Sequence, residues 1–228
     1  MIDNNTGGSM QIFKDRYQTI ANDWNLNRSV CTRIINRYSK KLEEEMADNS
    51  PVILPPSFKD RRTDKEYIFD LIEGWIIEDF ILAWFRNRIP GLKTSRAGKD
   101  SNRRIRRKSH GKISSRPDLH IITPRGCKRP LEVQVSRLEG QARFDVKTSK
   151  FDYLRRKGGM IIFVLLHENR FFIVYPRHIL ELGLQPAPNP CFGGKMTYCF
   201  TRKDIEKIGL HRLDGDLPDG LCKRLGIQ

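Results

Sequence analysis

The hydrophobic positions of this chain follow a helical period in its first part and an extended period in its middle. Between Met10 and Met46, apolar residues recur at the three- and four-residue steps of two short amphipathic helices. From Asp64 to Arg88 they are dense enough to predict a long core helix. The prolines of segment 49–60, between these regions, predict an extended connector because proline interrupts helices.

Strand patterns begin after Pro90-Gly91, which ends the long helix. The pattern predicts a short strand at 92–95, strands at 118–123, 130–136, 160–166 and 170–175, a helix at 144–157 and a hairpin turn at 167–169. Beyond Pro176 it predicts a helix at 177–182, a loop at 183–195, a strand at 196–200, a helix at 202–208 that Thr201 caps, and a polar tail. This order predicts an α/β (α+β) fold.

Three polar side chains interrupt the apolar strands near the middle of the chain. Glu132 and Gln134 alternate with valines, so they share one face of their strand. If the two strands form a hairpin, Asp118 lies beside Glu132. Two adjacent carboxylates repel each other unless a cation lies between them, and oxygen ligands suit Mg²⁺. The alternative is that Arg116 or Arg137 neutralises each carboxylate on an exposed face.

The charge of the chain indicates an anionic partner. The formal net charge is +15, and a polyanion such as nucleic acid is the partner that neutralises such an excess. Many of the cations lie just before the proposed site, at Arg103, Arg104, Arg106, Arg107, Lys108, Lys112 and Arg116. Such a segment supplies phosphate contacts and, through arginine, base contacts in the major groove. The alternative is a solvated run of charge.

The ordered set of elements resembles the PD-(D/E)XK nuclease superfamily, to which many type II restriction endonucleases belong. The resemblance covers residues 64–176 and includes Pro117-Asp118, Glu132-x-Gln134 and Gly74-x-x-x-Glu78. Gln134 stands where the family usually has lysine, as in restriction enzymes with an ExQ motif. A neutral amide does not offset charge on a phosphate, so Lys147 or Lys150 is a candidate to replace the missing lysine. The alternative is that both are ordinary surface lysines.

The resemblance implies a restriction-endonuclease-like core, with a central mixed β-sheet flanked by helices. It implies a Mg²⁺-dependent hydrolysis of DNA phosphodiesters, with Mn²⁺ as a substitute. Asp118 and Glu132 would hold the ion, with the Val133 carbonyl as a further ligand, and Gln134 would orient water or phosphate. Glu78 would complete the set of ligands around the ion, and the alternative is that it is only a charge on the exposed edge of the helix. Glu73 is a further, less favoured candidate for this role. Further DNA contacts are expected from Ser136, Arg137, Gln141, Arg143 and Lys147.

Three regions follow from this interpretation. Residues 1–9 are expected to be disordered, 10–55 to form an N-terminal helical appendage for dimer or DNA contacts, and 60–228 to form the nuclease domain. Because symmetric DNA sites call for two-fold symmetric proteins, we expect a homodimer on double-stranded DNA. His110 and His120 are expected to be polar residues without a role as general base. Met46 is expected to pack in a core or surface rather than to insert between DNA bases.

Other readings remain open at the level of sequence. One is a structure-specific nuclease, such as a Holliday junction resolvase or repair enzyme, and another is a non-catalytic DNA-binding module that has lost its lysine. Five cysteines without a CxxC pair indicate neither a zinc module nor a disulfide framework. No apolar run is long enough to cross a bilayer, so we expect a cytoplasmic protein without a membrane partner.

Overall fold

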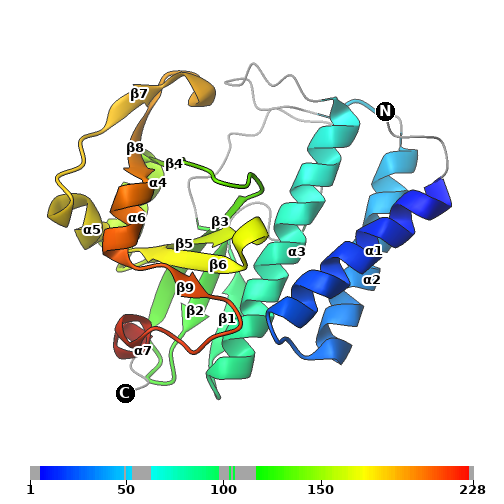
Figure 1. The fold of residues 1–228 in the computed structure, drawn as a ribbon, viewed down its shortest axis with the longest axis horizontal. Coiled ribbons are helices and arrows are strands. Elements are labelled where there is room, and N and C mark those ends of the chain that lie inside the picture. The colour runs from blue at the N-terminus through cyan, green and yellow to red at the C-terminus, as the bar shows by residue number, and fades with distance from the viewer. Residues whose placement is uncertain are drawn as a thin grey trace. The chain divides into compact units, whose positions relative to one another are not determined.

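The computed structural model describes residues 6–48, 50–52, 63–97, 103, 105 and 117–225. The chain divides into two compact units (Figure 1). The first, the helical unit, spans Met1–Pro51 and Arg62–Pro90, and the second, the sheet unit, spans Val52–Arg61 and Gly91–Gln228. This division groups the long helix with the two N-terminal helices, whereas the sequence predicts one domain over residues 60–228 that includes this helix and the strands. Of the segment 1–9 that is expected to be disordered, residues 1–5 lie outside the described residues, whereas residues 6–9 begin the first helix, so the expectation is wrong for them.

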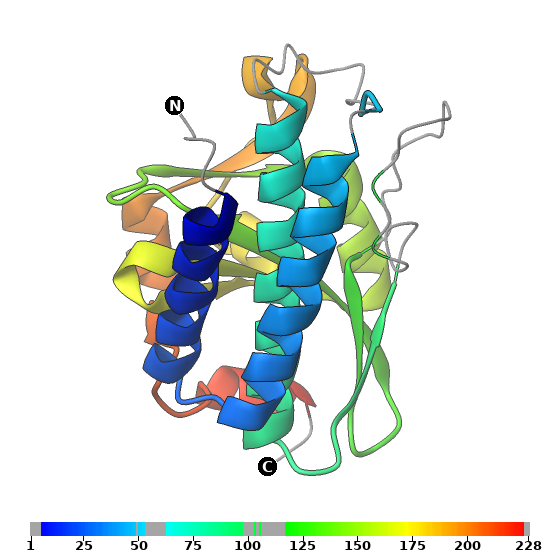
Figure 2. The ribbon, with the colours of Figure 1, turned by 90° about the vertical axis from the view of Figure 1, so that its right-hand side faces the viewer.

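The helical unit consists of α1 (Thr6–Asp23), α2 (Arg28–Ala47) and α3 (Asp64–Arg88), which run alongside one another (Figure 2). The two predicted N-terminal helices and the long helix are therefore confirmed. Local sequence sets two of the helix starts. The Asn27 side chain accepts a hydrogen bond from the backbone of Val30, and Thr63 and Glu66 form a reciprocal capping box at the start of α3.

Buried carboxylates on α3 tie the other two helices to it. Glu73 is buried and accepts a hydrogen bond of 2.5 Å from the Tyr17 hydroxyl of α1. Asp79 is buried and accepts hydrogen bonds from Arg37 and, at 2.9 Å, from the Tyr38 hydroxyl, both on α2. Because buried carboxylates are costly unless they are paired, these contacts fix which faces of the helices meet.

The sheet unit contains a six-stranded mixed sheet with the strand order β1-β2-β3-β5-β6-β9. Only the β3–β5 pair is parallel among these described strands, and α4 (Thr148–Lys157) lies between the two in sequence. The predicted strands and both hairpins are confirmed. The strands are β1 (Lys93–Arg96), β2 (Leu119–Ile122), β3 (Lys128–Ser136), β5 (Met160–Leu165), β6 (Arg170–Val174) and β9 (His211–Arg212).

A tight turn ends α4 beside β3. Gly158 has φ 63°, the left-handed conformation that glycine adopts readily at a helix C-terminus. At Gly159 a Cβ atom would lie 2.6 Å from the carbonyl oxygen of Pro130, which is closer than real Cβ contacts. Glycine is therefore required where β5 starts next to β3.

A second sheet has the order β4-β8-β7, and it corrects one sequence prediction. The helix expected over 144–157 begins only at Thr148, because residues 143–147 form strand β4. Phe144 and Val146 alternate with polar residues there, and both are buried against strand and helix neighbours. The strands are β4 (Arg143–Lys147), β8 (Lys195–Thr201) and β7 (Ala187–Asn189), followed after β7 by a 3₁₀ turn, η3 (Pro190–Phe192).

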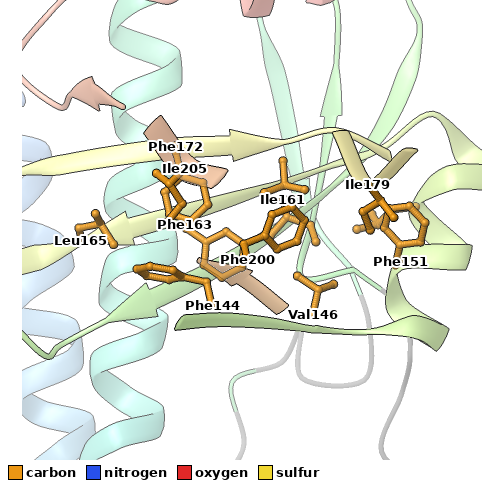
Figure 3. Close-up of a cluster of buried hydrophobic side chains, with 12 residues drawn as sticks. Phe144, Val146, Phe151, Ile161, Phe163, Leu165, Phe172, Ile179, Phe200 and Ile205 are labelled. Carbon is orange, nitrogen blue, oxygen red and sulfur yellow. The ribbon is translucent and has the colours of Figure 1, made fainter. Parts of the chain in front are cut away.

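An aromatic core joins this second sheet to the main one (Figure 3). The ring of Phe144 on β4 meets those of Phe163 on β5 and Phe172 on β6 edge-on, with centroids 5.7 and 5.2 Å away. Phe163 and Phe172 stack with centroids 4.7 Å apart. Such packing of large rings holds the two sheets in a fixed relation within the sheet unit.

The remaining short elements match the sequence only in part. The helix α6 (Arg202–Ile208) and its Thr201 cap are confirmed, as are the strand β8 and the helix α5 (Pro176–Glu181). The turn between β5 and β6 is a 3₁₀ turn, η2 (Leu166–Glu168), followed by left-handed Asn169. The strands β7 and β9 and the helix α7 (Asp219–Leu225) lie in segments expected to be loop or tail. They are short, so their patterns are too brief to recognise.

The fold is thus mixed α/β, with a mixed central sheet flanked by helices, as the sequence predicts. Among the described helices, none has both the length and the apolar character needed to cross a membrane.

Candidate functional site

Asp118 and Glu132 meet where β2 and β3 pair. Asp118 directly precedes β2, and the antiparallel register pairs Leu119 with Leu131. One step further along this register, Asp118 faces Glu132. The Oδ2 atom of Asp118 also accepts a hydrogen bond of 3.1 Å from the backbone N–H of Val133. The hairpin and the adjacency of the two carboxylates are therefore as the strand alternation predicts.

Glu132 is the more enclosed of the two acids. Its residue surface is only 4% exposed, and its Oε2 atom is buried without a hydrogen-bond donor among the described residues. Burial, and secondly the Asp118 carboxylate, raise the pKa of Glu132 well above its usual range. The neighbouring Asp118 can share a hydrogen bond with Glu132 only if one of the two acids holds a proton. The pair thus favours a bound proton or cation.

Lys150, in the first turn of α4, supplies a cation to this pair. Its Nζ atom donates to Oε1 of Glu132 and lies 4.0 Å from Oδ1 of Asp118. The side chain of Lys150 is only 19% exposed. Of the two lysines considered as substitutes for the missing family lysine, Lys150 is the one in contact with the carboxylates.

Lys147 lies nearby but faces other partners. Its Nζ atom sits 4.7 Å from the centroid of the Phe192 ring, a cation–π arrangement. Burial, then the ammonium groups of Lys195 and Lys150, lower the pKa of Lys147. Several ammonium groups therefore crowd the side of the site formed by β4, β8 and the start of α4.

Gln134 follows Glu132 by two residues on β3 and shares its face, as alternation in a strand requires. Its side chain is partly exposed, whereas Val133 between them is buried. The structure thus presents an amide at the accessible end of the row that begins with the buried carboxylate.

The metal chemistry of this site depends on few ligands. No group of three or more His, Cys, Asp or Glu side chains that could hold an ion occurs in the part of the chain that the structure describes. The carboxylate pair itself has the oxygen donors that Mg²⁺ prefers, and Oε2 of Glu132 is a buried acceptor that lacks a donor among those residues. The oxygen donors of these two residues are of the kind that suits a hard divalent ion.

Glu78 belongs to α3 in the helical unit, where its residue surface is partly exposed. The expected role of Glu78 as a metal ligand together with residues of the sheet unit remains a prediction. Glu73, the weaker choice, is buried and bound to Tyr17 and, at 3.1 Å, to Arg16 of the same unit. Its observed contacts serve helix packing.

Most of the basic segment lies outside the described residues, including Arg104, Arg106, Arg107, Lys108, Lys112, Arg116 and also His110. Arg103 is described, is only 9% exposed and has a left-handed backbone with φ 54°. His120 on β2 is partly exposed, and burial and then Lys128 lower its pKa.

The residues expected to contact DNA after β3 have differing surroundings. Ser136 is buried and donates its hydroxyl hydrogen bond to Gln141, whose amide in turn donates to the Arg143 carbonyl over 2.6 Å. These two side chains therefore brace the turn between β3 and β4. Arg137 is partly exposed, and Arg143 is exposed, with its Nε atom 3.1 Å from the Cys199 sulfur.

Lys195 near this site was not anticipated from the sequence. It lies on β8, beyond the span of the family resemblance, and comes close to Lys147 only through strand pairing. The alternating polar positions of β8 were the available signal, but they do not reveal the strand's partner.

Comparisons with protein-family models, with curated proteins and with solved structures found no match for this chain.

Proposed function

We propose that this protein is a Mg²⁺-dependent endonuclease that hydrolyses phosphodiester bonds of double-stranded DNA at a specific short sequence, as type II restriction endonucleases do. The observation that carries the proposal is the convergence of Asp118, Glu132 and Lys150 at one point of the sheet unit. Paired acids with an adjacent ammonium are the groups that a metal-assisted phosphodiester hydrolysis uses.

The order of elements supports the same proposal. A helix, three strands, a crossover helix and two more strands follow one another as α3, β1, β2, β3, α4, β5 and β6, with the short strand β4 inserted before α4. The restriction-endonuclease-like core that the sequence resembles carries its acids on two adjacent strands. Here β2 and β3 are adjacent strands that form a hairpin.

Each side chain has a distinct role in this proposal. Asp118 and Glu132 would hold the ion with the Val133 carbonyl, and Asp118 is oriented by the Val133 N–H. Bound there, a divalent ion would supply polarisation of a phosphoryl oxygen and a water of lowered pKa. Lys150 offsets the negative charge that builds on the phosphate, which the neutral Gln134 does not do. Gln134 orients water or phosphate through its partly exposed amide.

The net charge of +15 supports a DNA substrate, because cationic side chains bind phosphates with little dependence on sequence. Site-specific cutting of symmetric sequences further calls for a homodimer. Sedimentation of the protein with and without a duplex tests that part of the proposal.

Incubation with a plasmid of known sequence and Mg²⁺ tests the function directly. Discrete fragments support a restriction endonuclease, and cutting confined to branched DNA supports a junction-resolving or repair enzyme. A mobility shift without cleavage supports a non-catalytic DNA-binding module. The Asp118→Ala variant should lose cutting and keep DNA binding, and unchanged cutting by that variant would refute the assigned site.

A further inference from the structure

The sheet β4-β8-β7 has two faces of opposite character. Phe144 and Val146 of β4 and Phe200 of β8 are buried in the aromatic core. Strand alternation directs the other residues of both strands to the opposite face. The polar face of this sheet consists of Arg143, Asp145, Lys147, Lys195, Thr197, Cys199 and Thr201.

Strand register brings two lysines of this polar face together. Lys147 pairs with Thr197, so Lys195, two residues away on β8, is its diagonal neighbour. Diagonal neighbours in a sheet lie about 7–8 Å apart, within reach of long side chains. Repulsion from Lys195 helps to lower the pKa of Lys147, which agrees with this proximity.

The lysine pair adjoins the proposed catalytic centre. Lys147 is the N-cap residue of α4, and Lys150 in the first turn of the same helix binds Glu132. Arg143 continues the basic row along β4, two positions beyond Asp145, whose carboxylate accepts a 3.4 Å hydrogen bond from Thr197. Three cations and one carboxylate thus line the polar face at known positions.

The scaffold of this face is fixed. Its apolar side is anchored by Phe144 against Phe163 and Phe172 of the main sheet. Phe192, at the η3 turn that follows β7, meets the Lys147 ammonium from the same hairpin that carries Lys195. The positions of both lysine backbones are therefore set before any ligand binds, which lowers the entropic cost of binding.

We propose that Lys147 and Lys195 together bind a backbone phosphate of the DNA strand beside the scissile position, with Arg143 contacting the next phosphate along β4. This inference rests on the proposed function, because the duplex must lie against the carboxylate pair. It adds to that function a phosphate-binding surface on β4 and β8, in a part of the chain remote in sequence from the basic segment at 103–116.

Binding of a fluorescent duplex, measured by anisotropy without divalent ions over a range of salt concentrations, tests the surface separately from catalysis. Each lost phosphate contact reduces the slope of log K against log salt by about 1. We expect Lys147→Gln with Lys195→Gln to reduce the magnitude of the slope by about 1, because the phosphate that the two lysines share is lost. Lys195→Gln alone should reduce it in part, and Lys195→Arg should restore it.

Lys157→Gln is the matched control. It removes the same charge from an exposed lysine at the other end of α4 and should leave the slope unchanged. Equal slopes for Lys195→Gln and Lys157→Gln would overturn the proposed surface, as would a wild-type protein that binds no duplex. Thermal melting of Lys195→Gln, an exposed position, checks that the variant is folded.

The two proposals can fail independently. A reduced slope in a protein that cuts no DNA retains the phosphate surface and removes the nuclease. An unchanged slope in a protein that cuts DNA retains the nuclease and removes this surface.

Discussion

The ammonium of Lys150 binds the buried carboxylate of Glu132 across a separation of 18 residues in sequence. The helix α4 thereby brings a cation to the strand β3, whose own residue two positions after the acid is the neutral Gln134. The positive charge that β3 lacks at position 134 is thus supplied by Lys150 of α4.

Lys150→Met should lower the rate of DNA cleavage by about 10²-fold or more, because the charge that stabilises the attacked phosphate is removed. Methionine keeps an unbranched side chain of similar length, so packing at the start of α4 is preserved. Single-turnover cleavage of a duplex containing the recognised site measures the effect.

Lys157→Met serves as the control, since it changes the same helix at its exposed far end. If Lys150→Met cuts as fast as this control, the lysine has no part in the chemistry and only neutralises Glu132.

Asp118→Asn should raise the stability of the metal-free protein above neutral pH. The pKa of Glu132 is raised, first by burial and then by Asp118, so the folded state holds a proton that the unfolded state releases. Stability is therefore full below the unfolded glutamate value of about 4.3 and falls as pH rises toward the folded pKa. Removing one acid weakens that loss.

Melting curves at pH 6 and pH 8 in a chelator measure this effect. Each 1 kcal/mol of added stability should raise the melting temperature of Asp118→Asn over that of the wild type by about 2–4 °C at pH 8. Added Mg²⁺ should stabilise the wild type more than Asp118→Asn. Identical responses of the two proteins to Mg²⁺ would remove the carboxylate pair as an ion site.

Gly159→Ala should destabilise the sheet unit by about 1–3 kcal/mol. The added methyl group would meet the Pro130 carbonyl at 2.6 Å and the Leu154 side chain at 2.7 Å, so the start of β5 must move away from β3. Chemical denaturation measures the loss.

Gly220→Ala in α7 is the comparison, because its Cβ meets nothing within 4 Å and alanine favours helix. That variant should be as stable as the wild type or slightly more so. Equal denaturation midpoints for the two variants would contradict the close approach of Gly159 to Pro130 and Leu154.

Tyr17→Phe should destabilise the helical unit by about 1–3 kcal/mol, because the buried Glu73 carboxyl group loses the hydrogen bond from the Tyr17 hydroxyl. Tyr153→Phe removes a hydroxyl group from a partly exposed ring and should change stability little. Urea denaturation followed by circular dichroism compares the two, and a Tyr17→Phe midpoint no lower than that of Tyr153→Phe would argue against the contact.

Sequence periodicity was sufficient for the long elements and for the meeting of Asp118 with Glu132. Strand alternation and a short hairpin connection determine that meeting, and both are local properties. The sequence predicts helix over β4 because Phe144 and Val146 precede a true helix without a turn residue, and the strand's partner β8 follows only about 50 residues later. Long-range pairing of this kind leaves no local signal.

The contact of Lys150 with Glu132 shows the same limit. From the sequence, Lys147 and Lys150 are equal candidates, and only the switch from strand to helix at Thr148 separates them. Lys147 is thereby assigned to the polar face of β4, whereas Lys150 is turned toward the acids by the first helical turn. Likewise, Lys195 lies near Lys147 only because β8 pairs with β4.

The acids of α3 carry a consequence for assembly of the helical unit. Glu73 is matched to Tyr17 of one neighbouring helix and Asp79 to Arg37 and Tyr38 of the other. A slip of either neighbour by one turn would separate these buried carboxylates from the donors named above, at a free-energy penalty that apolar contacts alone would not impose. Burial of hydrophobic surface makes these three helices associate, but it is compatible with many alignments. The carboxyl groups of Glu73 and Asp79 select one of them.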